Sequence, residues 1–188
     1  MRLTRRRVLA SALLAGLSGC AGSEDRRSQT PTMTERGYEE RVDDPESVTV
    51  RHAGGEPAVR STLVSPTMEW DSERWLVGSR DELEALYFSA DATGVDAAEA
   101  FLAGTDLSAE SVLVHQYRVD ECVDWELQRL QWREAEQGPA GSVAVELRYE
   151  STERGSDCER GDDEDVAATF VRIPATFERV TRFGSWVS

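Results

Sequence analysis

The chain has 188 residues, which is enough for one domain with additional segments. Its 36 acidic residues outnumber 21 basic ones, and the net charge of −15 disfavours a nucleic-acid-binding protein. Every basic residue is arginine, because the chain contains no lysine. Strong acidity without lysine is typical of proteins that work in concentrated salt, where screening weakens self-repulsion. The coding bias of a GC-rich genome is the alternative explanation.

The N-terminus has the pattern of an export signal. Four arginines lie in the first seven residues, and the apolar run 8–17 that follows is too short to span a bilayer. The sequence TRRRVL, with Arg5 and Arg6, resembles the twin-arginine export motif. The sequence LSGC, which ends at Cys20, resembles a lipobox, in which the cysteine is lipidated and becomes the new N-terminus.

This order of motifs resembles that of a twin-arginine-exported lipoprotein of a halophilic archaeon. We therefore expect a signal peptide at 1–19, a lipidated Cys20 with a flexible tether at 20–46, and a folded domain at 47–188. Removal of the signal leaves 17 arginines against 36 acids, a net charge of −19. The resemblance implies a location at the outer face of the cytoplasmic membrane, held by the lipid. An ordinary N-terminal helix with a buried cysteine is the alternative.

The first half of the domain is predicted to contain short strands and two short helices. Strands are expected at 47–52, 59–64 and 74–78. Ser79 and Glu82 form a capping box, and the helix that it begins should carry Leu83, Leu86 and Tyr87 on one face. A second helix is expected at 96–103.

The second half is predicted to be a series of longer strands, at 111–119, 123–132, 141–150, 166–174 and 177–183. The phase of apolar residues slips near Gln128, which indicates a β-bulge. Trp132 lies out of phase with Trp125, so we expect Trp132 to be exposed. The whole pattern favours a mainly β (α+β) domain: a single small β-sandwich or half-open barrel with one or two short helices.

Cys122 and Cys158 are predicted to form a disulfide. They flank the expected hairpin at its open end, and exported proteins meet an oxidising environment in which such pairs persist. A metal or redox pair is the alternative, but the spacing is not that of CxxC and no further ligands are evident. The acidic run 157–165 could bind calcium, yet it lacks the ligand spacing of a calcium loop, and a solvated loop is the alternative.

The stretch FLAGTDLSAESVLVHQ, residues 101–116, contains a T-D-hydrophobic-S-x-E turn that leads into a strand. Together with the later FVRIP strand it resembles the protease-stabilising β domains of the PrcB type and uncharacterised lipoproteins of halophilic archaea, over about residues 80–174. Where PrcB-type domains have a GGY turn, this chain has VDECVDW, so the resemblance transfers no functional residue.

Two classes of function remain open. We expect a non-enzymatic surface domain that binds an unknown protein or small ligand, because no catalytic, metal or cofactor motif is visible. The alternative is a membrane-anchored extracellular hydrolase, in which His115 would lie in a cleft beside a serine or carboxylate. A buried or surface histidine without a catalytic role is the simpler interpretation of His115. The tryptophans could line a sugar or peptide groove, or pack in the core.

Overall fold

The computed structural model describes residues 38–64, 72–136, 138–155, 158 and 164–188, which all belong to one compact unit, Glu35–Ser188. The unit is mainly β and sandwich-like, as the sequence predicts, and its described part contains ten strands and two helices. The strands are β1 (Glu40–Asp43), β2 (Ser47–His52), β3 (Val59–Ser61), β4 (Ser72–Val77), β5 (Leu86–Phe88), β6 (Ser111–Asp120), β7 (Val123–Glu134), β8 (Ser142–Glu153), β9 (Glu164–Ile173) and β10 (Arg179–Val187). The helices are α1 (Arg80–Glu84) and α2 (Val95–Ala103).

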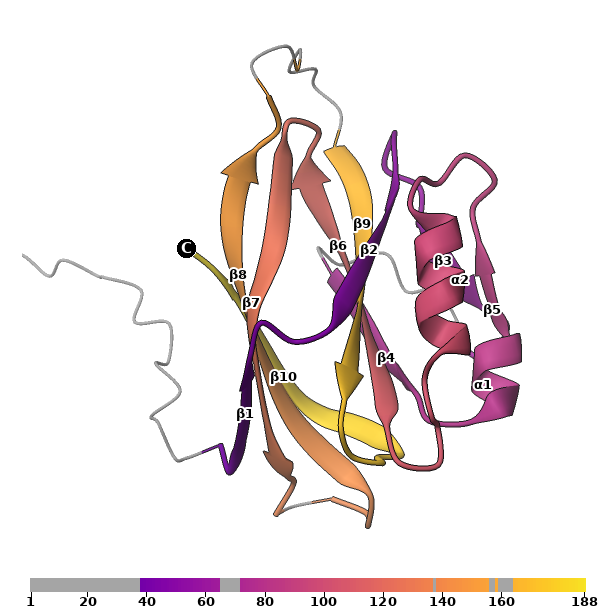
Figure 1. Ribbon diagram of the computed structural model, residues 1–188, viewed down its shortest axis with the longest axis vertical. Coiled ribbons are helices and arrows are strands. Elements are labelled where there is room, and N and C mark those ends of the chain that lie inside the picture. Colours follow the sequence, from indigo (N-terminus) through magenta and orange to yellow (C-terminus); the bar gives the residue numbers. More distant parts are fainter. Residues whose placement is uncertain (1–37, 65–71, 137, 156–157, 159–163) are drawn as a thin grey trace, which may run out of the picture. The chain divides into compact units, whose positions relative to one another are not determined.

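The strands form two four-stranded sheets and one small pair (Figure 1). Sheet A has the order β1-β7-β8-β10, and sheet B has the order β2-β9-β6-β4. Sheet B lies between sheet A and a third layer made of α1, α2 and the β3–β5 pair. All neighbouring strands are antiparallel except β8 and β10, which run parallel because the chain crosses to sheet B through β9 before it returns.

Sheet B is the central layer because its two middle strands are apolar on both faces. In β6, Leu113 and Tyr117 point into the core against sheet A, whereas Val112 and Val114 point into the core against the helices. The apolar side chains of β9 likewise alternate between the two cores. A strand buried on both faces appears in the sequence as a nearly continuous apolar run, and SVLVHQYRV has this character.

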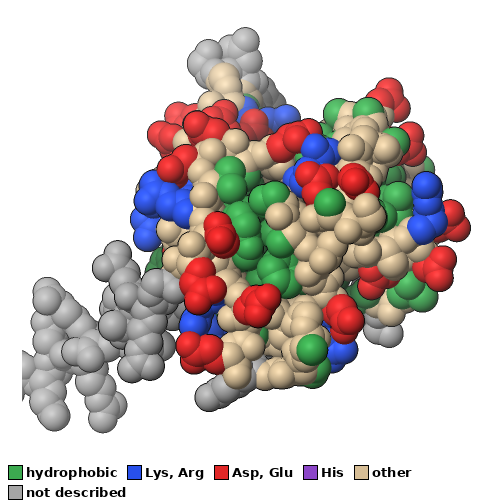
Figure 2. All heavy atoms as spheres, turned by 60° about the horizontal axis from the view of Figure 1, so that its bottom comes forward, with side chains coloured by type: hydrophobic (Ala, Val, Ile, Leu, Met, Phe, Trp, Pro, Cys, Tyr) green, Lys and Arg blue, Asp and Glu red, His purple; other side chains and the backbone are tan. Residues whose placement is uncertain are grey.

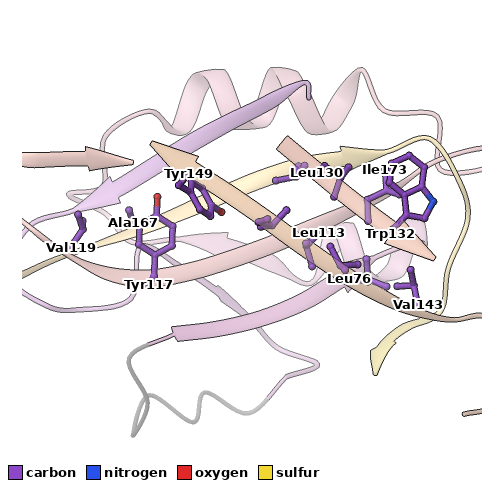
Figure 3. Packing of buried hydrophobic residues seen from close by; sticks show 13 residues of the cluster. Leu76, Leu113, Tyr117, Val119, Leu130, Trp132, Val143, Tyr149, Ala167 and Ile173 are labelled. Carbon is purple, nitrogen blue, oxygen red and sulfur yellow. The ribbon is translucent and has the colours of Figure 1, made fainter. Parts of the chain in front are cut away.

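Sheet A alternates because only its inner face is buried. In β8 the inner residues Val143, Val145, Leu147 and Tyr149 belong to the core between the sheets (Figure 3). The predicted bulge is confirmed, since the register of β7 against β8 shifts between Leu127 and Arg129. The prediction that Trp132 is exposed is wrong: its side chain is 6% exposed. The extra residue at the bulge turns Leu130 inward, and Trp132, two positions further on, therefore also points inward.

Two predicted boundaries are also corrected. Helix α1 ends at Glu84, and Leu86–Phe88 pairs with β3, so Leu86 and Tyr87 belong to strand β5 and not to the predicted helix. Strand β1, Glu40–Asp43, pairs with β7 inside the segment predicted to be tether. The folded domain therefore begins before residue 47.

Candidate functional site: the outer face of sheet A

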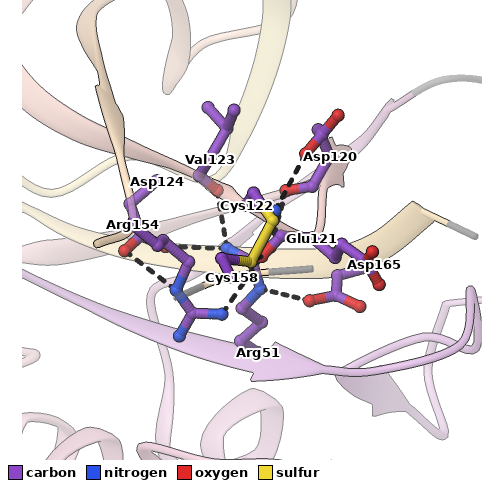
Figure 4. Close-up of a disulfide and its surroundings, with 9 residues drawn as sticks. All are labelled: Arg51, Asp120, Glu121, Cys122, Val123, Asp124, Arg154, Cys158 and Asp165. Atoms are coloured by element: carbon purple, nitrogen blue, oxygen red, sulfur yellow. Dashed lines mark hydrogen bonds and ion pairs between the residues drawn. A yellow bond between two sulfur atoms is a disulfide. The ribbon is translucent and has the colours of Figure 1, made fainter. Parts of the chain in front are cut away.

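The predicted disulfide is confirmed, with Cys122 in the β6–β7 turn and Cys158 in the β8–β9 connection. The two Cα atoms are 5.6 Å apart, which is ordinary disulfide geometry. The amide of Cys122 donates to the Asp120 carboxylate at 2.8 Å (Figure 4). The bridge closes the open end of the β7–β8 hairpin, as the sequence predicts.

Arg51 of β2 fills the space beside this disulfide (Figure 4). Its Nε donates to Asp165 at 2.6 Å and one terminal nitrogen donates to Asp124 at 2.7 Å. The other contacts, each 2.8 Å long, are to the backbone carbonyls of Asp120 and Val123. The guanidinium thus satisfies the carboxylates and carbonyls that surround it, and this buried charge is a structural group that links β2, β9 and the β6–β7 turn.

His115 lies in the core between the sheets, and its side chain is fully buried. Its Nδ1 shares a hydrogen bond of 2.9 Å with the Tyr149 hydroxyl, while Nε2 has no partner among the described residues. Burial, and then the nearby positive charge of Arg74, lower the pKa of His115 to about 3, so the ring is neutral. Tyr117 and Phe183 pack against the ring. His115 is therefore a core residue without a neighbouring serine or carboxylate in the described part of the chain.

The outer face of sheet A is the surface that remains for an interaction with other molecules. We define the arginine face as the outward-pointing residues of sheet A that the strand register places in adjacent rows. One row is Arg133, Ala144 and Arg182; the next is Arg41, Gln131, Glu146 and Gly184; the third is Asp43, Arg129, Arg148 and Trp186. Arg179, opposite Ser142, extends the face at one end.

This arrangement concentrates positive charge in an acidic protein. Six arginines and two carboxylates occupy these positions, although the chain as a whole carries 36 acidic residues and 21 arginines. The row that follows on the same outer face is acidic, with Glu126 opposite Glu150, and it bounds the arginine face. On the one face that Figure 2 draws, acidic side chains are more frequent than arginines, and they surround a patch of hydrophobic side chains. The six arginines come from the four strands of sheet A, of which only β7 and β8 are consecutive in the sequence: Arg41, Arg129, Arg133, Arg148, Arg179 and Arg182.

Glu146 is the buried centre of the arginine face. Its side chain is 9% exposed, and the Arg148 guanidinium lies 3.4 Å from its carboxylate. Burial, and then the charge of the nearby Glu146, raise the pKa of the Tyr38 phenol, whereas Arg133 and Arg182 lower it. Glu146 thus places a negative charge next to Arg148 within the arginine face.

The arginines differ in how much of their charge is already paired. Arg41 and Arg129 both contact Asp43 at 2.8 Å, and Arg133 lies 3.5 Å from Glu136 in the following turn. Arg179 and Arg182 are exposed and make no ion pair within the described ranges. The guanidinium groups of Arg179 and Arg182 can therefore bind an external anion without breaking an existing ion pair.

An aromatic side chain borders the same face. Trp186 is 45% exposed and lies beside Arg148 in the register, next to Gly184. A Cβ atom at Gly184 would lie 3.8 Å from the Trp186 Nε1 and 3.9 Å from the Glu146 Cγ. A side chain at position 184 would therefore begin in ordinary van der Waals contact with both the indole and the Glu146 side chain. Arginines next to an exposed aromatic ring suit a ligand with both negative charge and apolar surface.

The remaining predicted site residues lie mostly outside the described residues. This holds for Arg5, Arg6 and Cys20, and for most of the acidic run 157–165. Of that run's described acids, Asp165 pairs with Arg51, and Glu164 lies 3.8 Å from Arg118. The described residues contain no group of three or more histidine, cysteine or acidic side chains that could hold a metal ion. No described helix combines the length and the apolar character that a membrane crossing requires.

The arginine face was not predicted from the sequence. The alternation of Arg129, Gln131 and Arg133 in β7 places three polar residues on one side, which was the available signal. The arginines of the other strands, however, become neighbours of these residues only through the order of the strands in sheet A, which the pattern within one strand does not reveal. Comparisons of the chain with protein-family models, with curated proteins and with solved structures found no match.

Proposed function

We propose that the protein is an exported, lipid-anchored domain that binds an anionic ligand through the arginine face and has no catalytic role of its own. The observation that carries the proposal is the charge contrast between this face and the rest of the chain. Six arginines on one sheet surface of a chain with net charge −15 form a site for an anion. Arginine is suited to this role because its planar fork binds carboxylate, sulfate and phosphate groups in a bidentate manner.

The proposal of export rests on the order of motifs at the N-terminus and on the disulfide. Cys20 ends the lipobox-like sequence that follows the twin-arginine-like motif. The Cys122–Cys158 bridge agrees with an oxidising compartment, because cytosolic thiols are normally kept reduced. Together these features support a location at the outer face of the cytoplasmic membrane.

We favour binding over hydrolysis because of the position of His115. A hydrolase of the kind considered above would need this imidazole in a cleft, within reach of a serine or carboxylate. In the structure the ring is buried between the sheets and its Nδ1 is bonded to Tyr149. On the arginine face, in contrast, Arg148, Arg179 and Arg182 are exposed and accessible to a ligand.

The proposal is tested by binding to sulfated dextran, with neutral dextran as reference. The protein is the full chain with Cys20→Ser, which cannot be lipidated. A face variant carries Arg148→Gln, Arg179→Gln and Arg182→Gln, all at exposed positions. A control variant carries Arg60→Gln, Arg80→Gln and Arg118→Gln, which remove the same charge from other elements.

We expect the parent and the control variant to be retained on sulfated dextran alone, and the face variant to elute early. The salt concentration is lowered from about 1 M only as far as circular dichroism shows a folded chain, because screening weakens these contacts. Equal retention of the face and control variants, or no retention of the parent at any such salt concentration, would contradict the proposal.

A further inference from the structure

We infer that the anionic ligand of the arginine face is the headgroup surface of the membrane to which the protein is anchored, so that the domain docks with the outer face of sheet A on the lipids. This inference rests on the proposed function, since it requires both the anchor and the arginine face. It identifies the ligand by its chemistry, as phosphate-bearing lipid headgroups.

The place where the chain enters the domain carries the first step of the argument. Tyr38, the first described residue, lies beside Glu146 on the arginine face, and Arg41 of the first strand belongs to that face. Cys20 precedes Tyr38 by eighteen positions. A chain of this length reaches at most about 60 Å when fully extended. A lipid on Cys20 would therefore keep the arginine face close to the membrane, at an effective concentration on the order of millimolar.

The distribution of charge carries the second step. The layer on the other side of sheet B carries acids in the first turns of its helices, with Asp81 and Glu82 in α1 and Asp96 in α2. The exposed arginines Arg148, Arg179 and Arg182 lie instead on the outer face of sheet A, beside an acidic row formed by Glu126 and Glu150. Direct contacts between these guanidinium groups and anionic headgroups therefore favour the orientation in which the arginine face meets the membrane.

The chemistry of the face carries the third step. In concentrated salt the Debye length falls to about 3 Å, so only direct contacts between guanidinium and phosphate groups persist. Arg179 and Arg182 are free to make such contacts, as described above. Trp186, which is exposed, adds an amphipathic ring of the type enriched at headgroup depth, and its contribution does not depend on salt.

The test measures how the unlipidated full chain, with Cys20→Ser, sediments with lipid vesicles. The anionic vesicles contain equal parts of phosphatidylglycerol and phosphatidylcholine, and the reference vesicles contain phosphatidylcholine alone. The face variant and the control variant defined above are compared with this parent. Circular dichroism and thermal unfolding establish that all three chains are folded at the salt concentration used.

We expect the parent and the control variant to bind the anionic vesicles and not the reference vesicles, and the face variant to bind at least tenfold more weakly. Two results would overturn the inference. In the first, the face variant binds sulfated dextran more weakly than the control variant does, but the two variants bind anionic vesicles equally. The ligand is then a soluble polyanion, and the proposed function survives. In the second, neither probe distinguishes the variants, and the inference fails together with the proposed function.

Discussion

At the scale of single residues, the face of sheet B that packs against sheet A buries two ionisable groups, and the protein accommodates them in different ways. The Arg51 guanidinium is surrounded by two carboxylates and two carbonyls that accept its hydrogen bonds. His115 stays neutral because it faces aromatic rings and Arg74 and has no carboxylate beside it. The cost of burial is thus offset by pairing in one case and by loss of the proton in the other.

Replacement of Arg51 should be strongly destabilising, because Asp165 would keep a buried charge without a partner. We expect Arg51→Met to lower the free energy of unfolding by about 3–5 kcal/mol. The double variant Arg51→Met, Asp165→Leu removes both charges, and its free energy of unfolding should fall clearly less than that of the single variant. Guanidinium-induced unfolding of the two variants and the wild type provides the comparison. A double variant as unstable as the single one would show that the ion pair is not the source of the loss.

His115 should make the protein sensitive to acid. Its pKa is about 3 in the folded chain and about 6.5 when unfolded, so below pH 6.5 the unfolded chain binds the additional proton. The stability it contributes is fully present above pH 6.5 and is lost as the pH falls toward 3. His115→Asn places an oxygen near the position of Nδ1 and cannot titrate.

When the pH is lowered from 7 to 4.5 at constant salt, the free energy of unfolding of the wild type should therefore fall by about 2–3 kcal/mol more than that of the His115→Asn variant. Urea unfolding at the two pH values measures the difference. An equal decrease in the free energy of unfolding of both proteins would mean that groups other than His115 account for the whole pH dependence.

At the scale of elements, the sequence predicted strands wherever one pattern dominated. Val143, Val145 and Leu147 alternate cleanly, and β8 was found at that place. The apolar run of β6 predicted a strand, yet the position of this strand in the central sheet could not be derived, because a run buried on both faces does not indicate its neighbours. Leu86 has the spacing of a helical residue, but pairing with β3 determines its conformation.

The arginine face could not be predicted for the same physical reason. Residues 41, 133, 148 and 182 become neighbours only through the order β1-β7-β8-β10 and through the registers between these strands. The bulge in β7 illustrates how sensitive such a face is, since one extra residue decides that Trp132 points inward and Arg133 outward.

The disulfide is the element-scale feature with the clearest energetic consequence. It closes a sequence separation of 36 residues around the β7–β8 hairpin. In the chain-entropy model such a bridge contributes about 4 kcal/mol. Cys122→Ala with Cys158→Ala should lower the free energy of unfolding by about this amount, and a reductant should then have no further effect. An unfolding curve unchanged by the double substitution would contradict a stabilising role for the bridge.

At the scale of the whole molecule, charge dominates the expected behaviour. The mature chain would carry a net charge of −19, because its 17 arginines offset fewer than half of its 36 acids. Unscreened repulsion of this size opposes the compact state, and concentrated salt removes most of it. The same argument explains why the arginine face must use direct contacts rather than long-range attraction.

We therefore expect the melting temperature of the full chain to rise with potassium chloride concentration, and the fold to be lost when salt falls well below molar levels. Differential scanning calorimetry over a salt series measures this. A melting temperature that does not change on dialysis into dilute buffer would contradict the adaptation to salt, and would favour coding bias as the origin of the arginine-only composition.

The central claim is that a lipid on Cys20 holds the folded domain outside the cell. Mass spectrometry of the N-terminal peptide, from protein purified out of native membranes, tests it most directly. The account predicts a chain that begins at Cys20 and carries the added mass of lipid on that residue. A peptide that retains the residues before Cys20, or a Cys20 without any added mass, would contradict the claim and remove the basis for docking at the membrane.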